Sequence, residues 1–299
     1  VNPRSANASE MIERGLLVGT NRGFNVLFQF EDINEEPPVF MHCYDATNPE
    51  ARQFIWERCR ESYFDKGVAL FWLDACEPDI PPSEHNNLRF YLGTGMEVGC
   101  IYPLMHASAF YEGMKKAGAS EIINLCRSAW AGSQRYGAAV WSGDIASDWE
   151  TLRAQVAAGL NIMMSGIPWW TTDIGGFYGG NIYDSNFQEL IIRWFQYGVF
   201  CPLFRLHGYR QPESEGLLAG GADNEIWSFG EKAYGIIREL IDLRLHLRPY
   251  LMEQMRLASA RGIPPMRPLF FDYAEEPLYS IADEFLFGPD LIIAPVLEY

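Results

Sequence analysis

The stretch Val68-Ala69-Leu70-Phe71-Trp72-Leu73-Asp74-Ala75-Cys76-Glu77-Pro78 decides how this sequence is expected to fold. Six apolar residues follow Gly67 and end at a carboxylate, which is typical of a buried strand that presents an acid at its end. In a parallel barrel the catalytic groups stand at the carboxyl ends of the strands, because that face carries the loops that build the site. The stretch therefore predicts a barrel strand that delivers Asp74 to a functional site.

Four later apolar runs also end at a polar residue, and helical patterns separate most of them. We predict strands at 122–126, 138–141, 162–170 and 202–206, which lead to Arg127, Asp144, Asp173 and His207 respectively. Strands that alternate with helices indicate a parallel sheet flanked by helices. Five polar groups at the ends of five strands are therefore expected to converge on one site.

The helix before the first strand is marked most clearly. Asn48 is suited to cap it, Pro49 suits its first position, and Gly67 closes it. Residues Gly19 to Pro38 are predicted to be a loop. Further helices are expected at 5–17, 104–116, 148–160, 186–198 and 225–260, the last with a break at Pro249.

The pattern changes after Pro264-Pro265, where apolar runs at 266–271, 283–288 and 291–296 follow one another without helices. The expected fold class is α/β: residues 1–262 as a (β/α)8 TIM barrel that is truncated at its amino terminus, and residues 263–299 as the start of a C-terminal β-sandwich domain. An eight-stranded barrel needs three strands more than the five counted, and these would precede Val1.

Composition restricts the classes of function. The 299 residues are 48% hydrophobic and carry a net charge of −16, which argues against nucleic acid and anionic membranes as partners. No apolar run approaches the 18 residues that a spanning helix needs. The six cysteines lack a CxxC spacing and the five histidines lack an HExxH motif, so we expect free thiols and no metal. The location stays open, with the cytoplasm favoured.

Asp74 and Asp144 form a candidate pair of catalytic acids. Hydrolysis of a glycosidic bond needs one ionised and one protonated carboxyl group on either side of the bond. Strand-end aspartates also serve as caps and loop anchors, so the pair by itself leaves the function open. Trp72 and Trp141 flank the two acids and offer flat faces to a sugar ring, although core packing explains them equally well.

Other strand-end residues allow both a binding and a structural interpretation. Arg127 is suited to keep Asp74 ionised, to bind a hydroxyl or to form a structural salt bridge. Asp173 precedes the turn 174–177, whose glycines permit close approach of the backbone. His207 is suited to donate to a sugar hydroxyl or to a structural partner. Glu77 is expected to fix the loop after Asp74 rather than to react.

These segments resemble glycoside hydrolase family 31. Residues 72–78 (WLDACEP) resemble its nucleophile motif, and Arg127-Ser128 through Gly132–Tyr136 to Trp141-Ser142-Gly143-Asp144 resembles its acid/base segment. Residues 173–177 (DIGGF) and 205–208 (RLHG) resemble two sugar-binding motifs of the family. The four motifs occur in the family's order and span nearly the whole chain. The family's sugar-binding Asp after the first barrel strand has no counterpart here.

The resemblance implies a retaining α-glycosidase that acts on non-reducing ends without a metal or organic cofactor. It implies Asp74 as nucleophile and Asp144 as acid/base, with a sugar subsite lined by Arg127, Trp141, Asp173 and His207 and walled by Trp72 and Phe177. Ala75-Cys76-Glu77-Pro78 is closer to the bacterial α-xylosidases than to α-glucosidases, so an α-xylosidase is expected first.

Three alternatives remain open. They are an α-glucosidase or transglucosylase of the same family, a non-catalytic carbohydrate-binding relative or inactive fragment, and a metal-dependent barrel hydrolase. The expected partner is an oligosaccharide or other α-glycoside, and the sequence also allows a homo-oligomer.

Overall fold

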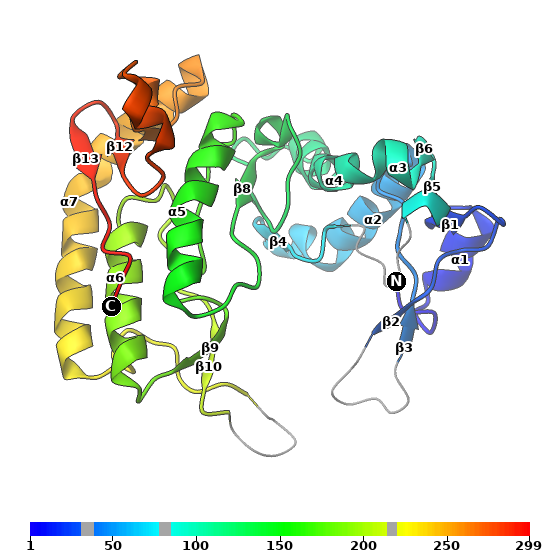
Figure 1. Cartoon of the computed structure of the whole chain (residues 1–299). Helices are drawn as coiled ribbons and strands as arrows, with labels where there is room; N and C mark the ends of the chain where they lie inside the picture. The colour runs from blue at the N-terminus through cyan, green and yellow to red at the C-terminus, as the bar shows by residue number, and fades with distance from the viewer. Residues whose placement is uncertain (31–38, 78–84, 214–219) are drawn as a thin grey trace. The chain divides into compact units, whose positions relative to one another are not determined.

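The computed structural model describes residues 1–30, 39–77, 85–213 and 220–299. These residues form two compact units, Val1–Ala138 and Ala139–Tyr299, which run from blue to green and from green to red in Figure 1. Each unit is described separately below.

The described residues of the first unit form short strands and four α-helices. Its elements are α1 (Ala8–Glu13), β1 (Gly19–Thr20), β2 (Phe28–Phe30), β3 (Val39–Met41), α2 (Pro49–Ser62), β4 (Phe71–Leu73), β5 (Leu88–Phe90), β6 (Gly93–Thr94), α3 (Gly95–Val98), α4 (Tyr102–Lys116) and β7 (Asn124–Cys126).

The second unit contains longer helices and ends in a small antiparallel sheet. Its elements are β8 (Ala138–Val140), which begins at the last residue of the first unit, α5 (Trp149–Met164), β9 (Tyr178–Asn181), α6 (Ser185–Gly198), β10 (Tyr209–Gln211), α7 (Glu231–Arg261), β11 (Met266–Pro268), β12 (Phe285–Phe287) and β13 (Leu291–Ile293).

The start signals of α2 act as the sequence predicts. The Asn48 side chain accepts a hydrogen bond from the backbone N–H of Glu50 at 2.9 Å, and Pro49 is the first helical residue. A 3-10 turn (Phe64–Lys66) follows, and Gly67 ends it at φ 98°, where a side chain would be strained. The chain then enters β4.

The predicted strand around Asp74 exists but is shorter than 68–74. β4 pairs with β7 in parallel, with Phe71 opposite Asn124 and Leu73 opposite Cys126. Leu73 and Cys126 are buried, whereas Val68, Leu70 and Trp72 are exposed. The alternation shows that only one face of β4 contributes to the core of this unit.

Two of the five predicted strands are wrong. Residues 162–164 belong to α5, because Met163 continues the buried face formed by Leu152, Val156 and Leu160. Residues 202–206 form no strand either, and only single bridges join Val140 to Trp170 and Ile174 to Leu206. The parallel pair in this region is instead β9 with β10.

Two further expectations fail because distant packing outweighs the local signal. The segment predicted as a loop contains β1, which pairs with β5, and β2, which pairs with β3; its residues 31–38 lie outside the described part. Pro249 lies inside α7 and does not break it. A proline removes one helical hydrogen bond, while α7 packs along α6 and buries residues on both sides of Pro249, such as Ile237 and Met255.

The runs after Pro265 form the expected β structure. β11, β12 and β13 make a three-stranded antiparallel sheet in which Phe285 and Phe287 are fully buried. The sheets formed by the described residues have two or three strands each, and these residues form no closed barrel. The eight-stranded closure is therefore absent from the part of the chain that the structure shows.

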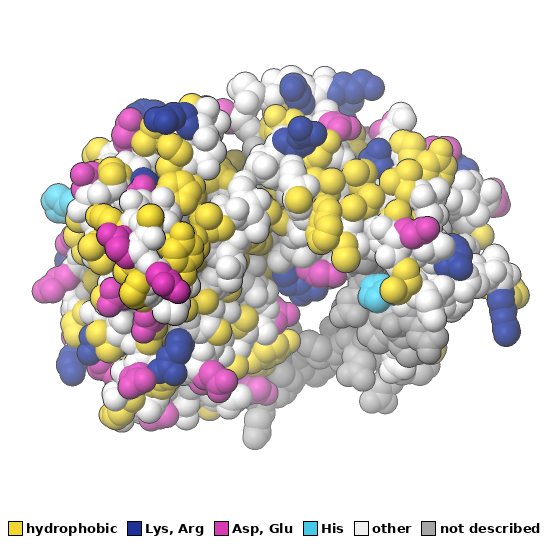
Figure 2. All heavy atoms as spheres, turned by 45° about the horizontal axis from the view of Figure 1, so that its top comes forward, with side chains coloured by type: hydrophobic (Ala, Val, Ile, Leu, Met, Phe, Trp, Pro, Cys, Tyr) yellow, Lys and Arg dark blue, Asp and Glu magenta, His cyan; other side chains and the backbone are white. Residues whose placement is uncertain are grey.

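Acidic and basic side chains alternate on one face of the surface. On the face shown in Figure 2, Asp and Glu side chains are interspersed with Lys and Arg. None of the helices formed by the described residues combines the length and the apolar character that a membrane span requires.

The packing of α2 on α4 depends on a glycine. A Cβ added to Gly113 of α4 would lie 2.2 Å from the indole ring of Trp56 of α2, whereas one added to Gly235 of α7 would meet no atom within 4 Å. We expect Gly113→Ala to lower the free energy of unfolding by about 1–3 kcal/mol through overpacking. Gly235→Ala should raise it by about 0.5–1 kcal/mol through helix propensity.

Urea unfolding of both variants followed by circular dichroism measures the difference. A stabilising Gly113→Ala would contradict the close approach of the two helices.

Candidate active site

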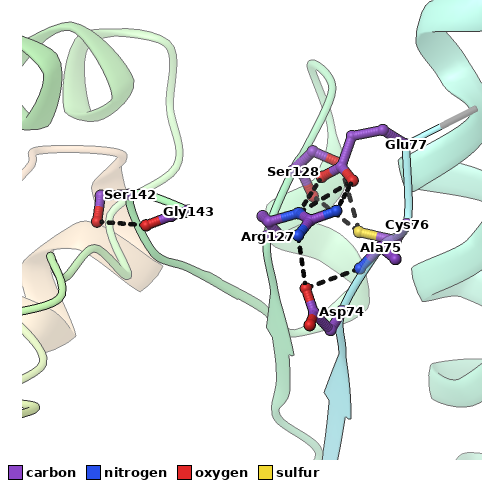
Figure 3. Close-up of polar contacts among 8 residues, drawn as sticks. All are labelled: Asp74, Ala75, Cys76, Glu77, Arg127, Ser128, Ser142 and Gly143. Carbon is purple, nitrogen blue, oxygen red and sulfur yellow. Dashed lines mark hydrogen bonds and ion pairs between the residues drawn. The ribbon is translucent and has the colours of Figure 1, made fainter. Parts of the chain in front are cut away.

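Arg127 joins two carboxylates at the end of β4. Its Nη1 lies 3.1 Å from Oδ1 of Asp74, and its Nη2 lies 2.8 Å from Oε2 of Glu77. Its Nε donates to both Glu77 oxygens at 3.1 and 3.2 Å. Figure 3 shows the guanidinium between the two acids. The arrangement places a permanent positive charge beside Asp74 and restrains the loop that follows.

The backbone after Asp74 adopts an uncommon conformation. Ala75 has φ 47°, the one positive φ outside glycine among the described residues. Its N–H donates to Oδ1 of Asp74 at 2.8 Å. Non-glycine residues avoid this region at a cost of order 1 kcal/mol. The strained turn therefore has a specific result, which is to aim a backbone donor at the carboxylate.

The loop after Asp74 also contacts the segment that follows β7. The Cys76 Sγ lies 3.3 Å from the hydroxyl of Ser128, and burial raises the pKa of this thiol. Burial also acts to raise the pKa of Glu77, but hydrogen bonds from Arg127 outweigh it and hold that pKa below its usual range. Glu77 is thus a charged partner of Arg127, in the loop-fixing position that the sequence suggested. Pro78 lies outside the described residues.

All six cysteines are free thiols; Cys76, Cys126 and Cys201 are buried, whereas Cys43 and Cys59 are half-buried and Cys100 is exposed. No group of three or more His, Cys, Asp or Glu that could hold a metal ion occurs among the residues described.

Asp173 is the most deeply buried acid among the described residues of the second unit. It has no exposed surface and pairs with Arg205 through Oδ1, while its Oδ2 has no hydrogen-bond partner in the structure. Its backbone N–H donates to the Ser142 hydroxyl at 3.0 Å. Burial raises the pKa of Asp173 to about 7, Arg205 opposes the rise, and the charge of Asp144 adds to it. Asp144 and Asp173 therefore belong to one electrostatic environment.

Trp141 and Trp72 differ in environment. Trp141 is buried, with 2% of its surface exposed, and the Arg205 guanidinium lies 5.7 Å from its ring centroid. Trp72 is 49% exposed at the end of β4. The core-packing interpretation therefore suits Trp141 in part and does not suit Trp72.

Phe177 and His207 lie together in the second unit. Their ring centroids are 5.4 Å apart, and the rings are inclined by 30°. The N–H of Phe177 donates to the carbonyl of Ile145 at 2.7 Å, which attaches this turn to the residue after Asp144. The predicted residues thus fall into two separate groups, one within each unit. The first unit holds Trp72, Asp74 and Arg127. The second unit holds Trp141, Asp144, Asp173, Phe177 and His207.

Sequence reasoning included Arg205 in the 205–208 motif but assigned it no role among the site residues. It is the single charge within the apolar run Pro202-Leu203-Phe204-Arg205-Leu206. A charged residue inside such a run is usually paired when buried. That signal was sufficient to single out Arg205, although not to identify Asp173 as its partner.

The parallel pairing, the strand-end acids and their arginine partners define an α/β protein with a candidate hydrolytic site. Residues 1–254 match the TIM-barrel domain of glycosyl hydrolases family 31, and residues 262–299 match the C-terminal domain of that family. The chain belongs to glycoside hydrolase family 31.

Three relatives illustrate the similarity. An α-xylosidase of this family from a soil metagenome, solved in complex with xylose, is 50% identical with a TM-score of 0.93, over 100% of this chain and 44% of its own. An uncharacterized family 31 glucosidase of Pseudescherichia vulneris is 49% identical over 71% of this chain and 39% of its own length. An α-xylosidase of Saccharolobus solfataricus is 38% identical over 89% and 36% respectively. The chain thus spans less than half the length of these relatives.

The raised pKa of Asp173 predicts a pH dependence of stability. An unfolded aspartate loses its proton near pH 4, whereas folded Asp173 retains it until about pH 7. In this window the folded state binds the additional proton, so its contribution to stability falls as the pH rises from about 4 to about 7. Asp173→Asn should remove this contribution.

The measurement is the free energy of urea unfolding of wild type and Asp173→Asn at pH 4.5, 6 and 7.5. The difference between the two proteins should change with pH, and the exposed control Asp283→Asn should show a constant difference. A constant difference for Asp173→Asn would contradict the raised pKa.

Proposed function

We propose that the protein carrying this chain is a retaining α-glycosidase that removes non-reducing terminal α-xylosyl residues. The observation that carries the proposal is the acid cluster at the end of β4. Asp74 is half-exposed, faces a guanidinium at 3.1 Å and accepts a hydrogen bond from the strained Ala75. Family membership adds the expectation of glycosidic chemistry.

The proposed mechanism is a double displacement. The Asp74 carboxylate attacks the anomeric carbon, and Asp144 gives its proton to the leaving oxygen, so that the glycosidic bond breaks and a glycosyl–enzyme ester forms. Asp144 then takes a proton from water, whose oxygen attacks the same carbon and releases Asp74. Arg127 and the Ala75 N–H orient the nucleophile throughout.

The proposed sugar subsite rests on the family's motifs, which are present at residues 72–78, 127–144, 173–177 and 205–208 of this sequence. Arg127, Asp173 and His207 carry charged or polar groups of the kind that bind sugar hydroxyls. The apolar faces are assigned to the aromatic residues Trp72, Trp141 and Phe177.

The choice of xylose over glucose is supported by relatives. Two of the three reported above are named as α-xylosidases, and one of these was solved with xylose. The glucosidase name of the third keeps α-glucosidase activity as the second candidate. We also propose residues 1–262 as part of the barrel domain and 263–299 as the start of the C-terminal domain, which the family matches support.

Substrate preference is tested with aryl glycosides on the protein that carries this chain. Xylose lacks the hydroxymethyl group of glucose, and a pocket that excludes one such group discriminates by roughly 10–200-fold. We expect kcat/KM for an aryl α-xyloside to exceed that for the matching aryl α-glucoside by at least about tenfold. An equal or reversed preference would remove the xylosidase assignment and leave the family chemistry intact.

The roles of the acids are tested by substitution and by product stereochemistry. Asp74→Ala should lower kcat by roughly 10⁴-fold or more, because the covalent step loses its nucleophile. Proton NMR of early product should show the α anomer, and the two carboxyl groups should lie roughly 5–5.5 Å apart in a crystal structure.

Asp283→Ala, at an exposed acid, is the control and should retain wild-type activity. Turnover by Asp74→Ala near the wild-type rate would exclude Asp74 as nucleophile, and a β-anomeric first product would exclude retention.

A further inference from the structure

Arg210 of β10 is a fully buried charge that no role described above uses. Six oxygens accept hydrogen bonds from its guanidinium. They are Asn224 Oδ1 at 2.7 Å, Gly176 O at 2.8 Å, Ile174 O at 3.0 Å, Gly175 O at 3.2 Å, Ser147 Oγ at 3.3 Å and His207 O at 3.3 Å. Burying a guanidinium is costly unless its donors are satisfied. Here the hydrogen bonds that the guanidinium would make to water are made to neutral oxygens, and none is made to a carboxylate.

The acceptors belong to separate segments that carry the candidate site residues. Ile174 to Gly176 form the turn between Asp173 and Phe177, Ser147 follows Asp144 by three residues, and His207 is itself a candidate. Backbone hydrogen bonds already link these segments in pairs, such as Tyr209 N–H to Phe177 O at 2.7 Å. The Arg210 side chain contacts all of them at once.

The surroundings leave room for this guanidinium by omitting side chains. A Cβ on Gly208 would lie 2.5 Å from Cζ of Arg210, and one on Gly175 would lie 2.7 Å from its Nη2. The Phe187 ring packs beneath it, with the centroid 5.1 Å from Cζ. Two glycines and an aromatic ring therefore form a cradle that fits a planar fork of donors.

Burial lowers the pKa of Arg210 to about 10, and the charge of Asp173 opposes this shift. The guanidinium is thus charged at neutral pH and retains its donors.

We propose that Arg210 is a positioning residue that fixes the mutual arrangement of the segments bearing Asp144, Asp173, Phe177 and His207. It touches none of the reacting atoms. Its hydrogen bonds to three carbonyls of the 174–176 turn, to Ser147 and to His207 set how far apart these segments lie. The effect on catalysis rests on the proposed function, whereas the effect on the segments themselves does not.

Arg244 of α7 provides a matched control. It is an arginine with the same kind of partners, since it donates to the carbonyls of Val199, Cys201 and Pro202 at 2.6, 2.6 and 2.7 Å and packs on Phe204 at 5.7 Å. None of these acceptor residues is a candidate site residue. Arg→Lys at either position keeps the charge and removes the fork, so half-buried Arg244, with three acceptors, controls for loss of the fork as such.

The experiment compares Arg210→Lys with Arg244→Lys in the protein that carries this chain. Displacement of site groups by about 1 Å costs roughly 10²-fold in rate. We expect kcat/KM to fall by roughly that factor in Arg210→Lys, mainly through kcat, and to stay within about twofold in Arg244→Lys. Equal losses in the two variants would overturn the positioning role.

Hydrogen–deuterium exchange gives a readout that does not require activity. In Arg210→Lys the amides of 145–147, 174–178 and 207–210 should all exchange faster, while Arg244→Lys should leave them protected. Unchanged protection in Arg210→Lys would overturn the proposal. A wild-type protein without glycosidase activity would refute the proposed function only, and the exchange result would still decide the role of Arg210.

Gly208→Ala tests the same contact without altering the arginine. Its Cβ would displace the guanidinium, so the variant should reproduce the exchange pattern of Arg210→Lys. The double variant should lose little more activity and protection than either single variant, because both substitutions remove the same interaction. Additive losses would show that Gly208 and Arg210 act separately, and would contradict the view that the cradle holds the guanidinium in place.

Discussion

The second unit depends on compensation of buried charge. Asp173 and Arg210 have no exposed surface, and Arg205 pairs with the former. Each charged group must recover from the protein what it loses in hydration. Arg210 recovers it from five carbonyl and hydroxyl oxygens and one amide oxygen, and this requirement draws the turns around it together. The turns that carry the predicted binding residues are thus joined both by the Arg210 guanidinium and by backbone hydrogen bonds.

Local signals predicted the elements whose formation is decided locally. The caps Asn48 and Asp148 accept hydrogen bonds from the first turns of α2 and α5, and the chemistry of a cap is visible in the sequence. The pairing of β9 with β10 and of β1 with β5 was not predicted, because partners far apart in the sequence leave no local periodicity. The errors at 162–170 and Pro249 have the same cause: helix packing outweighs a local preference.

For the candidate site, too, the sequence predicted some features and not others. Asp74, Asp144, Asp173 and Arg127 were visible because a polar residue at the end of an apolar run is conspicuous. Glu77 was visible because it follows Asp74 closely. The partners of these groups were not, since the contact of Arg205 with Asp173 and those of Arg210 with 174–176 join segments about 30 residues apart. A sequence shows which charges exist, but the pairing of buried charges requires the fold.

The environments of Asp74 and Asp173 are opposite. Asp74 is half-exposed beside a guanidinium that it shares with Glu77, whereas Asp173 is buried with a pKa raised to about 7. A nucleophile must be an anion at neutral pH, and its neighbourhood should favour charge. An acid/base group works best when its pKa lies near the operating pH. The charge of Asp144 raises the pKa of Asp173, so the buried pair with Arg205 is electrostatically coupled to the residue that we propose as the acid/base group.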